Sequence, residues 1–309
     1  MQTAVSRGLP HRILRSVLRD KWLWMFASVG IAWYVIFAYM PMYGVIIAFK
    51  EFSPFRGMAG SPWVGLQHFR EFFSSQFFWP LLRNTILLNV YSLLWGFPAP
   101  IILAILLHEC NLHIFKRVAQ TISYLPHFIS IVVIVGLLVN FTSSNGLFNV
   151  LIRTFGGDTI QFLIKPEWFR TLYVGSGIWQ TMGFSSIIYL AALTGVDQEM
   201  YEAAVVDGAS KVRQIWHISM PSILPTVVIL LILNLGRMLT VGFEKIILMY
   251  SPSVYETADV ISTFVYRRGI ENRQYSYSSA VGLFQSIINL IFLVTANAIS
   301  RKVTSSSLW

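Results

Sequence analysis

Residues 201–225 read YEAAVVDGASKVRQIWHISMPSILP, a pattern that predicts two short helices joined at a glycine. The residues before Gly208 are good helix formers, and glycine readily adopts the left-handed conformation that ends a helix. A second helical run follows over 210–218. Pro221 then begins a long apolar helix at a position where proline loses no hydrogen bond, and Pro225, one turn further on, is expected to kink it.

This segment has two features that a passive linker does not need. Ala203 and Ala204 give the first helix a smooth surface, which would let the backbone of a partner approach closely. Asp207 lies at the C-terminal end of that helix, where the helix dipole disfavours an acid. Lys211 or Arg213 can compensate this charge locally, and a cationic residue of a partner is the alternative.

The rest of the chain is too apolar for a water-soluble core. Of its 309 residues, 55% are hydrophobic and only 12% are charged, and the mean hydropathy is +0.61. A soluble domain typically carries about 25% charged residues. The composition therefore predicts an all-α, polytopic membrane protein, with a bilayer as its solvent.

Membrane spans follow from the length of the apolar stretches, because a helix needs about 20 apolar residues to cross the hydrocarbon layer. Six spans are predicted, over residues 22–40, 85–107, 118–140, 172–193, 221–243 and 279–300. Pro41 is expected to break or kink the first of them. This first span is too long for a cleaved signal peptide, so we expect a retained anchor.

The orientation follows from the basic residues near the N-terminus, since cytoplasmic segments are enriched in Lys and Arg. Residues 1–21 contain Arg7, Arg12, Arg15, Arg19 and Lys21. We therefore expect a cytoplasmic segment over 1–21 and a transmembrane domain over 22–300, with a cytoplasmic loop over 194–220 and a cytoplasmic tail over 301–309. Over the whole chain, the bias of Lys and Arg towards the cytoplasmic segments is moderate. It is a bias in charge density, because the external loops are longer.

Several function classes find no support in the sequence. The single cysteine, Cys110, allows no disulfide within the chain. No Cys/His cluster has metal-ligand spacing, and no glycine-rich phosphate loop is present, so we expect neither a metal site nor a nucleotide site. The net charge of +9 is scattered over loops rather than gathered on one helix face, which argues against nucleic-acid binding.

The opening segment resembles a known motif. The EAA loop of binding-protein-dependent ABC importer permeases of type I reads Glu-Ala-Ala, three residues, Gly, nine residues, Ile-x-Leu-Pro. Residues 202–221 of this chain are similar to it, with Met220 in place of the usual leucine. Because leucine and methionine are close in size and polarity, this difference changes little.

The resemblance implies that the loop is a coupling helix docked on an ATPase subunit. The coupling residues would be Glu202, Ala203, Ala204, Asp207, Gly208 and Pro221. It further implies a second permease, forming a heterodimer, two ATPase subunits that hold ATP and Mg, and an extracytoplasmic solute-binding protein. The chain would then be a multi-pass protein of a bacterial cell membrane, with no catalytic residue and no cofactor of its own.

Other segments resemble carbohydrate importers. MPMYG at 40–44 and SPWVG at 61–65 are similar to the beginning of carbohydrate-importer permeases. YETADV at 255–260, YRRG at 266–269 and VGLFQS at 281–286 resemble the branch that handles oligosaccharides or polysaccharide fragments. The resemblance implies an oligosaccharide cargo, which includes acidic polysaccharide fragments.

Polar residues inside the predicted spans are candidates for the substrate path, because polar groups in a bilayer usually face a cavity or another helix. Asn234 and Arg237 are three residues apart in the fifth span and would share a helix face. Arg237 would either meet a sugar hydroxyl or a uronate, or extend to the outer interface. Trp179 and Gln180 in the fourth span form a second candidate pair.

Three alternatives remain open. The same machine can carry another cargo, such as phosphate, an amino acid or a metal complex, and the EAA loop does not distinguish these. An ion-coupled secondary transporter would need Asp or Glu inside the spans, whereas the acids here lie almost wholly in loops. A membrane enzyme would need a catalytic set within the spans, and none is visible.

Overall fold

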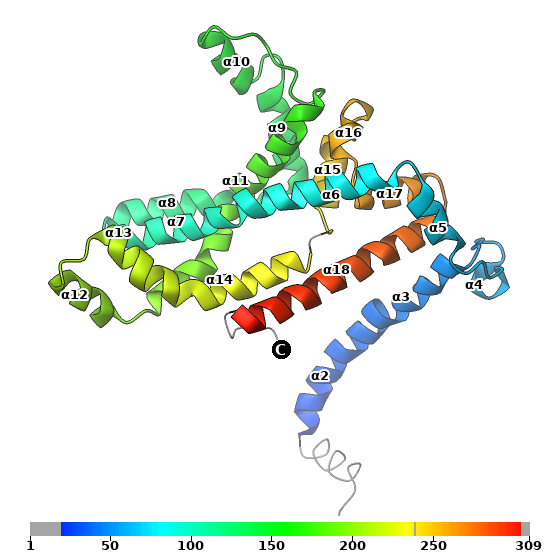
Figure 1. The fold of residues 1–309 in the computed structure, drawn as a ribbon, viewed down its shortest axis with the longest axis horizontal. Coiled ribbons are helices and arrows are strands. Elements are labelled where there is room, and N and C mark those ends of the chain that lie inside the picture. The colour runs from blue at the N-terminus through cyan, green and yellow to red at the C-terminus, as the bar shows by residue number, and fades with distance from the viewer. Residues whose placement is uncertain (1–19, 238, 304–309) are drawn as a thin grey trace, which may run out of the picture.

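The computed structural model describes residues 20–237 and 239–303, and the regular elements in these ranges are helices (Figure 1). This confirms the predicted all-α fold class. The predicted cytoplasmic segment 1–21 and tail 301–309 fall almost wholly outside the described residues. Many of the long helices run roughly along one direction, with α12 (Gln198–Val206) at one end and α5 (Gln67–Ser74) towards the other.

Membrane spans can be assigned to most of the predicted stretches. Five helical stretches are long and apolar enough to cross a membrane: Lys21–Phe49, Phe78–Glu109, Ile131–Thr154, Lys211–Leu235 and Tyr275–Arg301. The predicted fourth span, 172–193, lies inside α11 (Pro166–Thr194), which is also long enough but less apolar. α11 packs against α6, α7, α8, α9, α14 and α16, so it occupies the centre of the molecule.

The N-terminal helix stands apart from the rest of the chain. It comprises α2 (Lys21–Tyr34), a π-helical turn, α3 (Met40–Met42) and a 3₁₀ segment, η2 (Tyr43–Phe49). α2 has no buried residue, and the C-terminal end of this helix, η2, packs on α18 (Tyr275–Val303) (Figure 1). Pro41 does not end the helix, which continues through η2; it lies inside this continuous run, just after the π-helical turn Val35–Tyr39.

The second span is a single long helical element that packs on α11. It contains α6 (Phe78–Tyr91), a π-helical turn at Ser92–Gly96, and α7 (Pro98–Glu109). Buried apolar residues join α7, α11 and α14 in one cluster, namely Ile101, Ala104, Tyr189, Leu193 and Ile223. This cluster fixes the three helices relative to one another near the α12 end.

The predicted third span is wrong as a continuous helix over 118–140. The structure has α8 (His113–Tyr124), a 3₁₀ turn, then α9 (Ile131–Thr142) and α10 (Leu147–Thr154). Pro126 lies in the 3₁₀ turn, where it has no amide to donate. Ser130 caps a new helix by accepting from the Val133 amide at 3.4 Å. The apolar stretch that can cross a membrane therefore begins at Ile131.

The predicted fifth span is too long at its C-terminal end. A continuous helix runs from α13 (Lys211–Gln214) through a π-helical turn into α14 (Met220–Leu235), and Gly236 caps it. A Cβ atom at Gly236 would lie 2.6 Å from Leu293 Cδ1, so glycine lets the chain turn closely against α18. Arg237 therefore does not share a helix face with Asn234, contrary to the prediction.

The remaining short elements form the end of the molecule opposite α12, together with α4 (Gly57–Gly60) and α5 (Figure 1). They are α15 (Phe243–Met249), η6 (Pro252–Val254), α16 (Tyr255–Ala258), α17 (Ile261–Tyr266) and η7 (Arg267–Glu271). Phe72 of α5 is buried against Phe264 of α17 and Tyr277 of α18. The aromatic residues of this end thus form a core.

Candidate functional site

The loop between α11 and α13 has a well-defined turn. Asp197 caps α12 by accepting from the Glu199 amide at 3.0 Å. Gly208 has φ +73°, and its amide donates to the Val205 carbonyl at 3.0 Å, while the Ala209 amide donates to that of Ala204 at 2.8 Å. This is the left-handed helix end predicted for Gly208.

The loop is fixed to the membrane helices from inside. Tyr201 is buried, and its hydroxyl lies 3.0 Å from Ser219 Oγ. The Gln214 amide donates to the Ala209 carbonyl at 3.1 Å. Pro221 does not begin the spanning helix, contrary to the prediction, because it lies inside the continuous helix that begins at Lys211, just after the π-helical turn Ile215–Ser219. The loop is therefore attached firmly to the helix that crosses the membrane.

The outer face of α12 has no partner within the described part of this chain. Glu202, Ala203 and Asp207 are exposed, and Ala204 is half-buried. Val206 is 87% exposed although it is apolar. A surface that combines acids, small residues and exposed valine is suited to a protein partner.

The compensation of Asp207 by a neighbouring cation is not observed. Lys211 Nζ lies 3.0 Å from Glu109 Oε2 on α7, and His108 Nδ1 lies 3.5 Å from the other oxygen of Glu109. In residues 20–237 and 239–303 the Asp207 carboxylate has neither an ion pair nor a hydrogen bond. Neither Lys211, which is engaged by Glu109, nor Arg213 pairs with Asp207 in the described part of the chain, so the local compensation is not observed and a cation of a partner stays a prediction.

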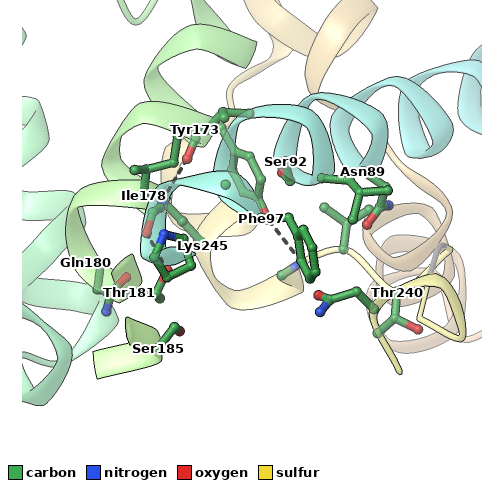
Figure 2. Close-up of a pocket in the computed structure, with 18 of the residues that line it drawn as sticks. Asn89, Ser92, Phe97, Tyr173, Ile178, Gln180, Thr181, Ser185, Thr240 and Lys245 are labelled. Atoms are coloured by element: carbon green, nitrogen blue, oxygen red, sulfur yellow. Dashed lines mark hydrogen bonds between the residues drawn. The ribbon is translucent and has the colours of Figure 1, made fainter. Parts of the chain in front are cut away.

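A cavity of about 780 Å³ lies between the second span, α11, α14 and the segment that follows α14 (Figure 2). Its volume falls within the range of about 300–1,000 Å³ that small-molecule sites occupy. Its polar lining side chains include Asn89, Ser92, Gln180, Thr181, Ser185, Asn234, Thr240, Glu244 and Lys245. Amide, hydroxyl and charged groups of this kind suit a polyhydroxylated solute.

The predicted path residues separate into two groups. Gln180 and Asn234 both line the cavity. Asn234 donates to the Leu230 carbonyl at 2.8 Å, which leaves its amide oxygen free to accept from a ligand. Trp179 and Arg237 are exposed and are not among the residues that line the cavity.

Lys245 is a cavity residue that the sequence reasoning missed. It is 6% exposed, and its Nζ donates to the Tyr173 carbonyl at 2.9 Å and lies 5.0 Å from the centroid of the Tyr173 ring. The Tyr173 hydroxyl in turn accepts from the Gly242 amide at 3.1 Å (Figure 2). A signal was present, because a lysine beside the apolar run IILM is unusual.

A buried ion pair fixes the end of the molecule opposite α12. Asp259 accepts from both terminal nitrogens of Arg267, at 2.5 and 3.2 Å, and from the Thr263 hydroxyl at 2.8 Å. The Asn84 amide of α6 donates to the Asp259 carbonyl at 3.1 Å. Burial alone would lower the pKa of Arg267, but the hydrogen bond and charge of Asp259 raise it above its ordinary value. The Arg267 guanidinium therefore remains a cation.

With this geometry in place, the comparison with known proteins decides the family. Residues 96–305 match the family described as the inner membrane component of binding-protein-dependent transport systems. The chain belongs to this family. Its relatives include permease subunits of ABC transporters, a class in which ATP is hydrolysed by separate subunits.

Two curated relatives from Bacillus subtilis (strain 168) align with nearly the whole chain. Protein LplB is 44% identical over 297 residues, which cover 96% of this chain and 93% of LplB. The polygalacturonan/rhamnogalacturonan transport system permease protein YteP is 44% identical over 292 residues, covering 94% of this chain and 91% of YteP.

Solved structures share the fold. A chain of a bacterial ABC transporter involved in the import of the acidic polysaccharide alginate matches with a TM-score of 0.89 and 43% identity, covering 95% of this chain and 99% of that chain. A second match is a chain of the bacterial alginate transporter in complex with an alginate pentasaccharide-bound periplasmic protein. It has a TM-score of 0.89 and 42% identity, and the match covers 96% of this chain and 100% of that chain. The permease fold therefore extends over nearly the whole chain.

Proposed function

We propose that this chain is the permease subunit through which an ATP-driven importer moves an oligosaccharide into a bacterial cell. The observation that carries this proposal is the match of 95% of the chain to a chain of the alginate importer, with a TM-score of 0.89. The names of further relatives support a saccharide cargo, since they include arabinooligosaccharide and multiple-sugar transport permeases. The cavity, lined by amides and hydroxyls, is a suitable path for such a solute.

The loop around α12 is proposed to couple transport to the ATPase subunits, which bind ATP and Mg. Glu202 and Asp207 would contact cationic groups of an ATPase, and Ala203 with Ala204 would allow close packing. Gly208 would set the turn, and Pro221 would connect the loop to the spanning helix. The exposure of this surface and the unpaired carboxylate of Asp207 support this role.

The assembly and its orientation are also proposals. A second permease would complete the path, and the unburied helix α2, which stands away from α18, offers a surface for it (Figure 1). We infer that α12 and both termini lie in the cytoplasm. The opposite end, with α5 and η7, would then face the extracytoplasmic solute-binding protein.

The cargo class is tested by ATP hydrolysis in the reconstituted complex, with the solute-binding protein present. We expect oligosaccharides to stimulate hydrolysis severalfold over the rate without solute, because a loaded binding protein favours the state that hydrolyses ATP. Amino acids, phosphate and metal chelates, tested at the same concentration, are expected to leave the rate unchanged. Stimulation by one of these solutes and by no saccharide would contradict the proposal.

The structure predicts different effects for two neighbouring residues. Asn234→Ala removes a hydrogen-bonding group from the cavity, which costs about 1 kcal/mol and should raise the half-saturating substrate concentration for uptake about fivefold. Arg237→Ala changes an exposed residue outside the cavity lining and should leave uptake within about twofold of the unmodified complex. Uptake kinetics at several substrate concentrations check both variants. A larger loss of uptake in Arg237→Ala than in Asn234→Ala would place Arg237 in the path.

A further inference from the structure

Lys245 places a positive charge against the cavity. Among the described residues that line the cavity, Lys245 is the only lysine or arginine. The other charged lining residue is Glu244, its neighbour in α15. Consecutive helical positions point in directions about 100° apart, and no ion pair joins these two side chains in the described part of the chain. Lys245 therefore has no ion-pair partner among the described residues.

The hydrogen bonds of the ammonium group are incomplete. Lysine has three N–H donors, and within the described residues one of them is used, by the Tyr173 carbonyl at 2.9 Å. Nζ lies close to Gly177, where a Cβ atom would come within 3.4 Å of it, so this glycine leaves room around the ammonium. Two donors thus remain for a group that enters the cavity.

A purely structural role does not explain a lysine at this position. A neutral donor can bind the Tyr173 carbonyl, and it does not carry the cost of a buried charge. A buried charge without an ion-pair partner is expensive, and such a group is a candidate for contact with a substrate or an ion. The local arrangement therefore favours an anionic ligand as the partner of this lysine.

We propose that Lys245 is the specificity-determining residue of the path and that its ammonium binds a carboxylate of an acidic oligosaccharide. This inference rests on the proposed function, because it names the substrate class for the same cavity. A uronate carboxylate would accept from the two unused N–H groups. Gln180, Thr181 and Asn234, which line the same cavity, can bind the sugar hydroxyls.

The test compares uptake by the complete complex, reconstituted in liposomes with ATP inside and the solute-binding protein outside. The probes are a labelled oligouronate and the same oligosaccharide with its carboxyl groups reduced to alcohols. Lys245→Gln keeps a donor for the Tyr173 carbonyl but removes the charge, and should lower oligouronate uptake about 10- to 100-fold at subsaturating substrate. Lys245→Arg retains the charge, so its oligouronate uptake should stay within about threefold of that of the unmodified complex. Any uptake of the carboxyl-reduced probe by Lys245→Gln should also stay within about threefold of that of the unmodified complex.

A second variant separates the charge from the fold. Cys110 is the one native cysteine of the chain, so Lys245→Cys can be made in a Cys110→Ser background. Treatment with 2-bromoethylamine then converts the new cysteine to an aminoethyl side chain that closely matches lysine. We expect it to restore oligouronate uptake, whereas iodoacetamide, which adds a neutral group, should not. The Cys110→Ser complex treated in the same way is the control.

The outcomes distinguish this inference from the proposed function. Unchanged oligouronate uptake by Lys245→Gln, or import of only the carboxyl-reduced oligosaccharide by the unmodified complex, would overturn the role of Lys245 and leave the oligosaccharide permease intact. Equal rescue by the charged and the neutral reagent would also overturn it. Import of no saccharide at all by the unmodified complex would overturn the proposed function, and this inference with it.

Discussion

Gly208→Pro is expected to reduce ATP-driven uptake at least 100-fold. Gly208 has φ +73°, whereas proline requires φ near −65°, and its amide donates to the Val205 carbonyl at 3.0 Å, which proline cannot do. The combined cost of about 3 kcal/mol or more would force the end of α12 into another conformation. In Gly208→Ala the Cβ atom has room, so the unfavourable term is the left-handed backbone conformation, which costs about 1–2 kcal/mol. Its loss of uptake should therefore lie between that of the unmodified complex and that of Gly208→Pro.

Gly57 provides a matched control at the opposite end of the molecule. It has φ +64°, no atom within 4 Å of the position that a Cβ would take, and an amide that donates to the Ser53 carbonyl at 3.0 Å. Co-purification of the ATPase subunits is the decisive readout, since Gly208→Pro should weaken it and Gly57→Pro should not. Equal loss in both variants would show a general folding defect, and normal ATPase binding and uptake by Gly208→Pro would contradict the coupling role.

Arg267→Ala is expected to destabilise the folded permease by about 3–5 kcal/mol. The substitution leaves the carboxylate of Asp259, whose side chain is 12% exposed, without its cation. Replacing both partners, as in Asp259→Leu with Arg267→Met, removes the uncompensated charge and should recover most of the loss. Thermal unfolding of the purified complex in detergent compares both variants with the unmodified complex.

The exposed ion pair between Lys211 and Glu109 is the control for this prediction. Lys211 is 66% exposed at its side chain, so Lys211→Ala should change stability by less than about 1 kcal/mol. A similar melting shift for Arg267→Ala and Lys211→Ala would mean that the buried pair contributes little. A double variant as unstable as Arg267→Ala would instead assign the loss to packing around Arg267.

The sequence predicted the turn at Gly208 well because its signals are local. Gly208 ends α12 as expected, since a glycine after a run of helix formers needs no tertiary information. Length and apolarity predicted six spans, whereas five helical stretches are long and apolar enough to cross a membrane, and the predicted fourth span lies in α11, which is less apolar. The polar and small residues of α11 that line the cavity, such as Gly177, Gln180 and Thr181, are consistent with that difference.

The predicted span boundaries were wrong where averaging hydropathy over about 20 residues does not detect a local break in the helix. Pro126 and Ser130 interrupt the predicted third span, because one lacks an amide and the other caps a new helix. Gly236 ends α14 early, so Arg237 leaves the helix. Lys245 was missed for a different reason, since its importance depends on Tyr173 and Gly177 of α11, about 70 residues away in the chain.

The central claim is tested most directly by uptake of a labelled oligosaccharide into liposomes that contain the complete complex. The solute-binding protein is supplied outside, and ATP is enclosed. We expect accumulation only when ATP, the binding protein and this chain are all present, and no uptake when ATP is replaced by a non-hydrolysable analogue. Uptake driven by a proton or sodium gradient without ATP, or uptake that persists without this chain, would contradict the account.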